Sequence, residues 1–292
     1  MEFRTLRAFV EVVRRGGFTP AAKATFSTQS TVSKAVRQLE DELGAPLLDR
    51  LGHRSTPTAV GEVVYRRAVR ILAERDDLIA ELDELRGLKR GVLRLGLPPV
   101  GSSTLFAPLF AAYRSRYPGV EVRLVEHGSE RLEEILLAGD IDLAASLLPM
   151  SEEFEFQEVR TEPLVVVVSS RHPLAAREAT DLLGVRDMPF ILYEAGFGLN
   201  RVILQACRRR GFEPSVVARS SQIDFIVALA AAGLGIGFLP RMIAEQRGEP
   251  GVARVLLDEP QTAWRLAMIW RRGAYLSDAA RAWLALAREA AP

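Results

Sequence analysis

Three short amphipathic segments at the N-terminus constrain the fold of this chain more than any other feature. The first has its apolar residues at the i, i+3, i+4, i+7 spacing of one helical face: Leu6, Phe9, Val10 and Val13. Gly16 and Gly17 favour a helix end, because glycine readily adopts the left-handed conformation found there. We therefore expect three short helices on a small core.

Capping residues mark the starts of the next two segments. Thr19 followed by Pro20 is expected to begin the second helix, because a threonine hydroxyl can accept an unpaired N–H and proline is tolerated at the first helical position. Thr28 is expected to cap the third helix, and Gly44 to end it. The core-facing stripe of that helix is Val32, Ala35, Val36, Leu39 and Leu43.

Polar side chains gather away from this stripe, in the first turns of the third segment. This is typical of a recognition helix, which enters the DNA major groove with its N-terminal residues near base edges. Glutamine can read adenine, lysine or arginine can read guanine, and serine suits bases or phosphates. A solvated polar face explains any one residue alone, but the three segments together favour DNA contact. The predicted contacts are Thr19, Gln29, Ser30, Thr31, Ser33, Lys34 and Arg37.

A short basic segment follows the third helix and suits a wing lying on the phosphate backbone. Its predicted contacts, Arg50, His53 and Arg54, would supply affinity and register rather than sequence information. Residues 1–57 contain nine Lys and Arg against six Asp and Glu, whereas the whole chain has a net charge of only +1. Because this excess is modest, DNA binding is expected to need two or more copies of the domain.

The segment from Thr58 to about Leu88 has the pattern of one long helix that pairs with a second copy. It has no proline, and Gly61 is its only glycine before the end. Apolar residues alternate by four and three, as in a coiled coil, with Arg75 interrupting the seam. A long solvated connector is the alternative, and residues 87–91 would form a hinge. The predicted dimerisation residues are Val64, Ala68, Ile71, Leu78, Leu82 and Leu85.

These segments resemble the LysR-type transcriptional regulators, and the resemblance extends over the whole chain. The stretches that follow the family pattern most closely are residues 18–23, 29–33, 38–44 and 58–61. Two residues of the wing depart from it, since His53 stands where the family usually has arginine and Pro57 where it usually has leucine.

Residues 91–292 alternate short apolar, β-rich runs with helical stretches, which predicts α/β units with largely parallel sheets. Their length exceeds one typical domain, so two subdomains with a cleft are expected. The expected strands are 92–97, 120–125, 141–145, 164–169, 190–193, 216–219, 234–239 and 265–270. The expected helices are 105–117, 131–138, 200–210, 224–232 and 277–290.

The resemblance implies a homo-oligomeric regulator with an N-terminal winged helix-turn-helix, a linker helix and a periplasmic-binding-protein-like effector region. Two recognition helices would engage a pseudo-palindromic DNA site about one helical turn apart, and the family commonly forms tetramers. The expected domains are 1–57 (winged helix-turn-helix), 58–90 (linker and hinge) and 91–292 (effector binding). Within the last, subdomain 1 would hold 91–162 and 265–292, and subdomain 2 would hold 163–264.

Several strand ends in this region offer groups that suit a small anion. Ligands bind beyond the carboxyl ends of strands in open α/β sheets, and helix N-termini present free N–H groups there. Ordinary capping explains each position alone, but their convergence favours a carboxylate-like effector. The predicted effector-binding residues are Gly101, Ser102, Ser103 and Ser129, with Phe197 and Ile223 as cleft walls.

Other signals give no support to a catalytic, metal or cofactor site. Residues 233–237 look like part of a dinucleotide fingerprint, but they have the wrong spacing and lead from a helix into a strand. The three histidines have no ligand pattern around them, and no nucleophile elbow or paired catalytic carboxylates are evident. The single cysteine, Cys207, precedes three arginines that could lower its pKa, although a lone cysteine on an apolar helix is more often a packing residue.

We therefore interpret the chain as a ligand-responsive regulator with no catalytic residues, metal or cofactor. The expected partners are double-stranded DNA, a small effector and further copies of the chain in a homodimer or homotetramer; RNA polymerase is left open as another. One cysteine, no secretory signal and no apolar run of about 18 residues predict a cytoplasmic protein without a membrane partner. An enzyme built on residues 91–292 and a ligand-independent architectural DNA-binding protein are the alternatives.

Overall fold

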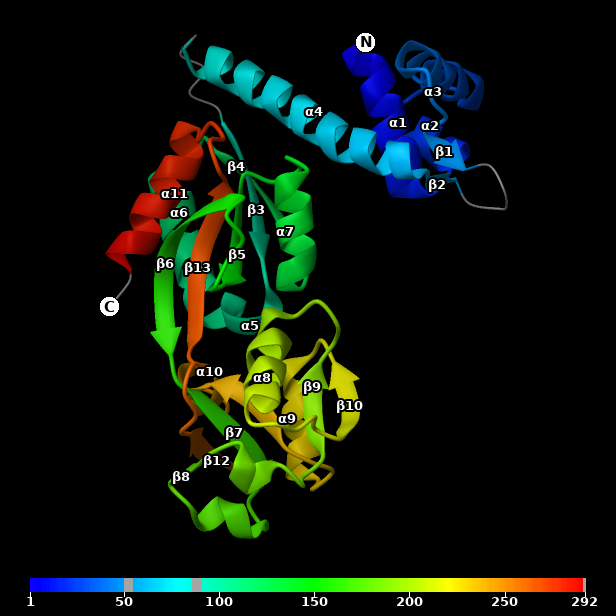
Figure 1. The fold of residues 1–292 in the computed structure, drawn as a ribbon. Coiled ribbons are helices and arrows are strands. Elements are labelled where there is room, and N and C mark those ends of the chain that lie inside the picture. The colour runs from blue at the N-terminus through cyan, green and yellow to red at the C-terminus, as the bar shows by residue number, and fades with distance from the viewer. Residues whose placement is uncertain (50–54, 86–90, 291–292) are drawn as a thin grey trace. The chain divides into compact units, whose positions relative to one another are not determined.

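The computed structural model describes residues 1–49, 55–85 and 91–290, which form two compact units (Figure 1). One unit comprises residues 1–87 with 137–140, and the other comprises 88–136 and 141–292. The long helix after the wing therefore belongs to the first unit. Most of the expected hinge lies outside the described residues.

In the first unit, the three predicted helices are α1 (Phe3–Arg15), α2 (Phe18–Ala24) and α3 (Gln29–Leu43). Their apolar faces meet in one core, where the side chains of Phe9, Val36 and Leu39 are fully buried. This burial follows from the i, i+3, i+4 spacing of the apolar residues.

The helix ends follow the expected signals in α1 and α3 but not in α2. Gly16 and Gly44 end α1 and α3 in the left-handed conformation, and the Thr28 hydroxyl caps α3 by accepting the N–H of Thr31 at 3.2 Å. The prediction that Thr19 begins α2 is wrong. Phe18, partly buried against the core, is already helical, so Gly17 is the N-cap.

One residue of the predicted α3 stripe is not in the core. Leu43 is 42% exposed, because it lies in the last turn of α3, beyond the helices that cover Leu39.

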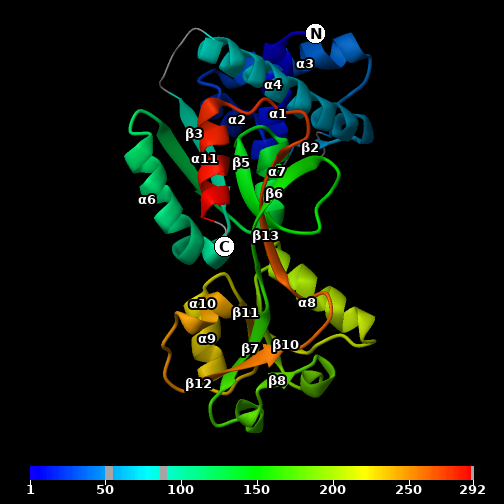
Figure 2. The same ribbon diagram turned by 90° about the vertical axis from the view of Figure 1, so that its left-hand side faces the viewer.

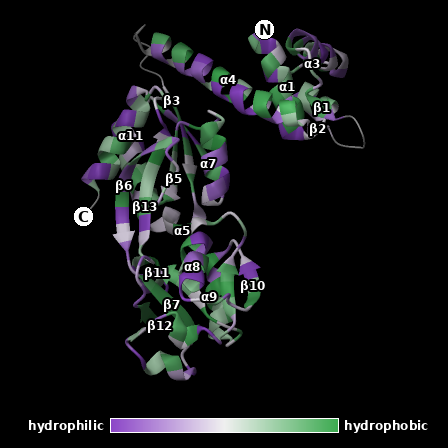
Figure 3. Cartoon of the chain, viewed as in Figure 1, coloured by the Kyte–Doolittle hydropathy of each residue, from purple (hydrophilic) through white to green (hydrophobic). Residues whose placement is uncertain are grey.

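The wing and a long helix complete the first unit. Strands β1 (Leu48–Asp49) and β2 (Thr56–Pro57) pair antiparallel, and α4 (Ala59–Leu85) follows them. Hydrophilic and hydrophobic residues alternate along α4 (Figure 3). Its first half packs on the core through Ala68, Val69 and Leu72.

The start of α4 passes very close to the segment that leads into the wing. A Cβ atom at Gly61 would lie 2.0 Å from the carbonyl oxygen of Leu47, which accepts the N–H of Thr58 at 3.0 Å. Because the obstructing atom belongs to the backbone, a rotamer change cannot relieve the clash. Only glycine fits at this position.

Gly61→Ala is expected to lower the free energy of unfolding of the first unit by about 3 kcal/mol, at the upper end of the usual cost of overpacking. Urea unfolding followed by circular dichroism would measure this. Tryptophan fluorescence should not change, because all three tryptophans lie in the second unit. Gly17→Ala, where the nearest atom to an added Cβ is 3.7 Å away, is the control and should cost far less. An equal loss in both variants would contradict the clash.

The first sheet of the second unit contains, in spatial order, β4 (Glu121–Glu126), β3 (Val92–Leu97), β5 (Leu143–Leu147), β13 (Trp264–Arg271) and β6 (Phe154–Glu162). Helices α6 (Ala107–Arg116) and α11 (Asp278–Glu289) cover one face of it, and α7 (Ser129–Leu137) covers the other (Figures 1 and 2). Between β3 and α6 lie the short α5 (Pro99–Gly101) and a π-helical turn, η1 (Ser102–Phe106).

The second sheet contains β11 (Gly237–Pro240), β7 (Leu164–Ser169), β12 (Val252–Leu257) and β8 (Ala179–Thr180). A bridge between Phe190 and Ile236 joins it to the parallel pair β9 (Phe190–Tyr193) and β10 (Val216–Ser220). Helix α8 (Gly198–Arg209) lies on one side, and α9 (Ile223–Ala231) and α10 (Arg241–Glu245) lie on the other (Figure 2). Short 3-10 helices span Pro173–Ala176 and Leu183–Val185.

The mixed α/β architecture was expected, but the prediction of largely parallel sheets is wrong for half of the pairings. Strand β13 is antiparallel to both β5 and β6, and β7 is antiparallel to both β11 and β12. The chain crosses between the two sheets after β6 and again after β12, and each strand at these crossings has at least one antiparallel neighbour. Strands β6 and β12 were themselves missed from the sequence.

Large aromatic residues lie in the core that packs against the first sheet. Trp264, Trp283 and Tyr113 are fully buried, and the Tyr113 hydroxyl donates to the carbonyl oxygen of Ala279 at 2.9 Å. Among the described helices, none has the length and apolar character needed to cross a bilayer.

Candidate nucleic-acid interface and effector site

The start of α3 presents a cluster of polar side chains to solvent. Gln29, Lys34 and Arg37 are exposed, and within the described part of the chain their side chains have no hydrogen-bond or ion-pair partner. The hydrogen-bond donors and acceptors of these side chains are therefore available to an external partner. Because buried Val32 and Val36 fix the rotation of α3, these three side chains point away from the core.

The hydroxyls near this helix start are engaged differently. The Thr28 hydroxyl lies 2.9 Å from that of Ser30 and 2.8 Å from that of Thr31, so both are held at the cap. Ser33 is partly buried, whereas Thr19 is exposed on α2. Among the seven predicted contacts, Gln29, Lys34 and Arg37, with Thr19 on α2, are exposed and have no side-chain partner within the described residues.

A carboxylate that the sequence reasoning missed fixes the wing to α3. Glu40 Oε1 accepts the backbone N–H of Leu47 at 2.9 Å, where the chain enters β1. The Thr58 hydroxyl donates to the carbonyl oxygen of Pro46 at 2.8 Å and holds the other end of the wing. The predicted wing contacts Arg50, His53 and Arg54 lie outside the described residues.

The predicted pairing stripe of α4 divides into two parts. Ala68, only 1% exposed, and the partly buried Val64 belong to the core of their own domain, so the prediction that Ala68 faces a partner is wrong. Ile71, Leu78 and Leu82 are exposed by 38%, 56% and 43%. The side chain of Leu85 lies outside what the structure describes.

Arg75, predicted to interrupt the pairing seam, instead makes contacts within its own domain. Its guanidinium lies 5.7 Å from the ring centre of Phe3, and it pairs with Asp76 at 2.6 Å. Asp76 also pairs with Arg7 of α1 at 3.4 Å. These contacts fix the middle of α4 against α1.

In the second unit, the predicted serines after β3 lie in a π-helical turn rather than at an α-helix start. Gly101 has a φ of +100°, and a Cβ there would lie 2.9 Å from the ring of Trp264, so the tight approach needs glycine. The Ser102 hydroxyl donates to the carbonyl oxygen of Pro98 at 2.5 Å. Ser103 is exposed.

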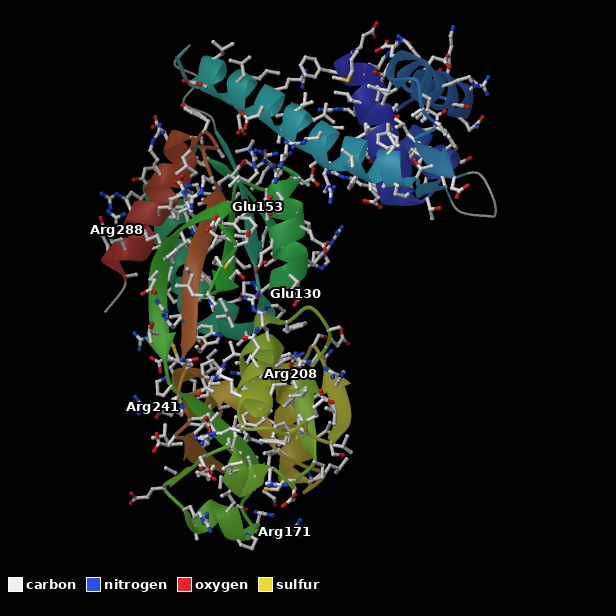
Figure 4. The ribbon with its side chains drawn as sticks, in the orientation of Figure 1. Glu130, Glu153, Arg171, Arg208, Arg241 and Arg288 are labelled. Atoms are coloured by element: carbon white, nitrogen blue, oxygen red, sulfur yellow. The ribbon has the colours of Figure 1, made fainter. Side chains whose placement is uncertain are left out.

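Ser129 lies where the two predicted subdomains touch. It is the buried first residue of α7, and a Cβ at Gly198, the first residue of α8, would lie 3.2 Å from its hydroxyl oxygen. The N–H of Glu130 donates to the carbonyl oxygen of Gly196 at 3.1 Å, and Figure 4 shows Glu130 at this end of α7. The starts of α7 and α8 therefore meet directly.

The two predicted wall residues are buried at the starts of helices. Phe197 is the N-cap of α8, and its ring stacks on that of Tyr193 with centres 5.3 Å apart. Ile223 begins α9. A second contact between the subdomains lies nearby, where the Thr104 hydroxyl donates to Gln246 Oε1 at 2.7 Å.

Comparison with known families decides what these two units are. Residues 3–62 match the bacterial regulatory helix-turn-helix protein, lysR family, and residues 86–292 match the LysR substrate binding domain. The chain belongs to the LysR family of transcriptional regulators. It is a DNA-binding LysR-type regulator with an effector-binding domain.

Relatives of this LysR-type regulator cover nearly all of its length. An uncharacterized HTH-type transcriptional regulator of Bacillus subtilis, YwbI, is 37% identical over 97% of this chain and 95% of its own. The HTH-type transcriptional regulator BudR of Raoultella terrigena is 32% identical over 93% and 95%. Their names favour a regulator over the enzyme alternative.

Solved structures share the fold of this LysR-type regulator. A full-length OxyR variant from Pseudomonas aeruginosa superposes with a TM-score of 0.72 at 24% identity, covering 99% of this chain and 94% of that one. Full-length CbnR in complex with its target DNA gives a TM-score of 0.63 at 23% identity, covering all of both chains. The predicted family and fold class are confirmed.

Cys207 is a packing residue in this LysR-type regulator. Its side chain is fully buried on α8, and burial, with a smaller effect from Glu259, raises the pKa of the thiol to about 11. A protonated, enclosed thiol reacts poorly with oxidants, so the three following arginines do not activate it. Figure 4 shows one of them, Arg208, on α8. Within the described residues, no group of three or more His, Cys, Asp or Glu side chains is placed to hold a metal ion.

The sequence reasoning missed four residues beside the predicted effector groups: Thr104, Tyr193, Gln246 and Arg247. Tyr193 ends β9, a strand whose carboxyl end was already expected to face a ligand, so its position was an available signal. Gln246 and Arg247 follow α10, whose five residues are too few to show helical periodicity. No sequence signal could have placed those two near η1.

Proposed function

We propose that this regulator reads a pseudo-palindromic DNA site with the α3 helices of two copies, and that a small carboxylate in the effector domain controls it. The observation that carries the DNA part is the start of α3, where Gln29, Lys34 and Arg37 are exposed and unpaired within the described part of the chain. Glutamine suits adenine, and the two cations suit guanine or phosphate.

The exposed stripe of α4 supports pairing of two copies. Ile71, Leu78 and Leu82 are large, apolar and spaced by seven and four residues, which places them on one side of the helix. A second α4 would cover them. Two such dimers in a tetramer would add a second half-site and let the protein bend the DNA between them.

A carboxylate effector is supported by Ser129 and by the helix starts around it. Helices α7 and α8 begin side by side, and the free N–H groups of a helix start favour an anion. Ser102 would join them by exchanging its bond to Pro98 for one to the ligand. Bound between subdomains, such an anion would prefer one arrangement of them, which a switch requires.

Ser102→Ala with Ser129→Ala should abolish the response to small carboxylates and leave DNA affinity intact, because both serines lie far along the chain from α3. The screen would test propionate to hexanoate and benzoate by their effect on the unfolding temperature of the full-length protein. DNA affinity would be measured separately by fluorescence anisotropy. Ser115→Ala, an exposed serine on α6, is the matched control. An equal thermal response in the double variant and the wild type would remove these serines from the site.

The same screen tests the ligand-independent architectural protein. That alternative predicts no change in unfolding temperature with any small molecule, together with full DNA binding.

A further inference from the structure

The Tyr193 hydroxyl is a buried polar group that has no partner. Within the described residues, two buried side-chain atoms lack a hydrogen bond, Tyr193 Oη and Trp283 Nε1. The Trp283 indole lies among aromatic rings of the core, edge-on to Phe110 and Tyr113. Tyr193, in contrast, is the last residue of β9 and lies where a strand end faces a ligand in open α/β sheets. A buried hydroxyl without a partner costs free energy, and a ligand acceptor would remove that cost.

Strand geometry places Tyr193 on the side of the sheet covered by α9. Side chains alternate along a strand, so Tyr193 shares a face with Ile191. Phe190 pairs with Ile236, so Ile191 aligns with Gly237 in the next strand. A Cβ at Gly237 would lie 2.8 Å from the Ile226 side chain, which belongs to α9. Tyr193 therefore points to the side of the sheet that α9 covers, and its ring stacks on Phe197, the N-cap of α8.

Arg247 brings a positive charge to the same place. Its Nε donates to Asp224 Oδ1 in the first turn of α9 at 2.8 Å, and its Nη1 donates to the carbonyl oxygen of Ile243 at 3.2 Å. A guanidinium has five N–H groups, and the structure shows no partner for the other three among the described residues. Burial raises the pKa of Tyr193, and the charge of Arg247 acts on the same hydroxyl in the opposite direction.

The ion pair with Asp224 leaves Arg247 available to a ligand. The Asp224 side chain is 87% exposed, so solvent screens its charge, whereas Arg247 is partly buried. The neighbouring Gln246 accepts a hydrogen bond from Thr104 of η1, in the subdomain that carries Ser102. The Tyr193 and Arg247 pair thus lies beside the contact between the two subdomains.

We propose that Tyr193 and Arg247 bind a second acidic group of the effector, so that the effector is a small dicarboxylate. This inference rests on the proposed effector site, which would hold the first carboxylate at Ser102 and Ser129. The Tyr193 O–H and the free Arg247 N–H groups would donate to the second carboxylate, and the free N–H groups of the α9 start would add to them. A dicarboxylate would then contact both groups of residues, whereas a monocarboxylate would occupy only the site at Ser102 and Ser129.

The test uses full-length protein and four matched pairs of acids: malonate and propionate, succinate and butyrate, glutarate and valerate, adipate and hexanoate. Each acid would be added at a series of concentrations and at fixed ionic strength. At each concentration, heat unfolding of the second unit would be followed by tryptophan fluorescence. At least one dicarboxylate should bind ten or more times more tightly than its monocarboxylate. Tyr193→Phe and Arg247→Gln should each weaken that dicarboxylate about tenfold and leave the monocarboxylate unchanged.

Tyr113→Phe is the matched control, because it removes a hydroxyl that already has a partner. It should lower the unfolding temperature without acid and leave the affinity unchanged, whereas Tyr193→Phe should not lower that temperature. Equal affinity for both members of every pair, or full dicarboxylate affinity in Tyr193→Phe, would overturn the inference. If the two members of every pair bind equally and the Ser102 and Ser129 double variant loses this binding, the proposed site stands and only the contact of Tyr193 and Arg247 with a second carboxylate is overturned. No binding by any of the eight acids would overturn both.

Discussion

Gln29→Ala with Lys34→Ala is expected to weaken binding to the specific DNA site at least a hundredfold. A good side-chain contact to a base edge contributes about 1–3 kcal/mol, and a dimer would lose two contacts in each half-site. Both side chains are exposed and have no partner within the described residues, so their removal should leave the unfolding temperature unchanged. Fluorescence anisotropy with DNA from the region flanking the gene would measure the loss.

The same titration at several salt concentrations separates reading of bases from attraction to phosphates. Loss of base contacts lowers specific affinity while non-specific binding remains, whereas loss of phosphate contacts weakens all DNA alike and reduces the salt dependence. Gln205→Ala with Arg208→Ala is the matched control, since it removes a glutamine and a cation from the exposed side of α8. Equal affinity of the α3 variant and this control for the specific site would show that Gln29 and Lys34 do not read it.

Leu78→Asp with Leu82→Asp is expected to separate the paired α4 helices and lower DNA affinity about a thousandfold. Two aspartates from each copy would meet in the seam, where burial of an unpaired charge is very costly. A single domain with a modest excess of basic residues would then bind each half-site alone. Analytical ultracentrifugation would measure the mass, and anisotropy the affinity.

Each α4 should remain folded in that variant, because Leu78 and Leu82 are exposed in the single chain. Leu183→Asp is the control: it places the same charge at an apolar residue that is 41% exposed in the second unit. An unchanged mass for the α4 variant would mean that this stripe does not pair the copies.

Helices and strands whose apolar residues follow a clear local pattern were predicted well from the sequence. Helices α1 and α3 follow from apolar spacing and glycine ends, and β3, β7 and β9 from short apolar runs bounded by turn residues. Strand β6 was missed because it is an edge strand whose charged residues alternate with apolar ones outside a buried run. Ala68 was assigned to a partner because spacing alone cannot show which neighbour covers a helix face.

The effector region shows why sites that depend on tertiary contacts escape such reasoning. Ser129 was found because it stands at a helix start after a strand, which is a local signal. The side of the sheet to which Tyr193 points depends on strand register, and the position of Arg247 depends on a hydrogen bond to a residue 23 positions earlier. Neither relation leaves a pattern in the surrounding residues.

The most direct test of the whole account is the DNA affinity of the full-length protein with and without a bound carboxylate, at constant ionic strength. The acid would be the one that most raises the unfolding temperature of the second unit. We expect the bound acid to change the Kd for the specific site by about 5- to 150-fold, the usual range for coupled sites, and we expect Ser102→Ala with Ser129→Ala to remove the change. A Kd that stays the same while the acid is bound would contradict control of DNA binding by the effector domain.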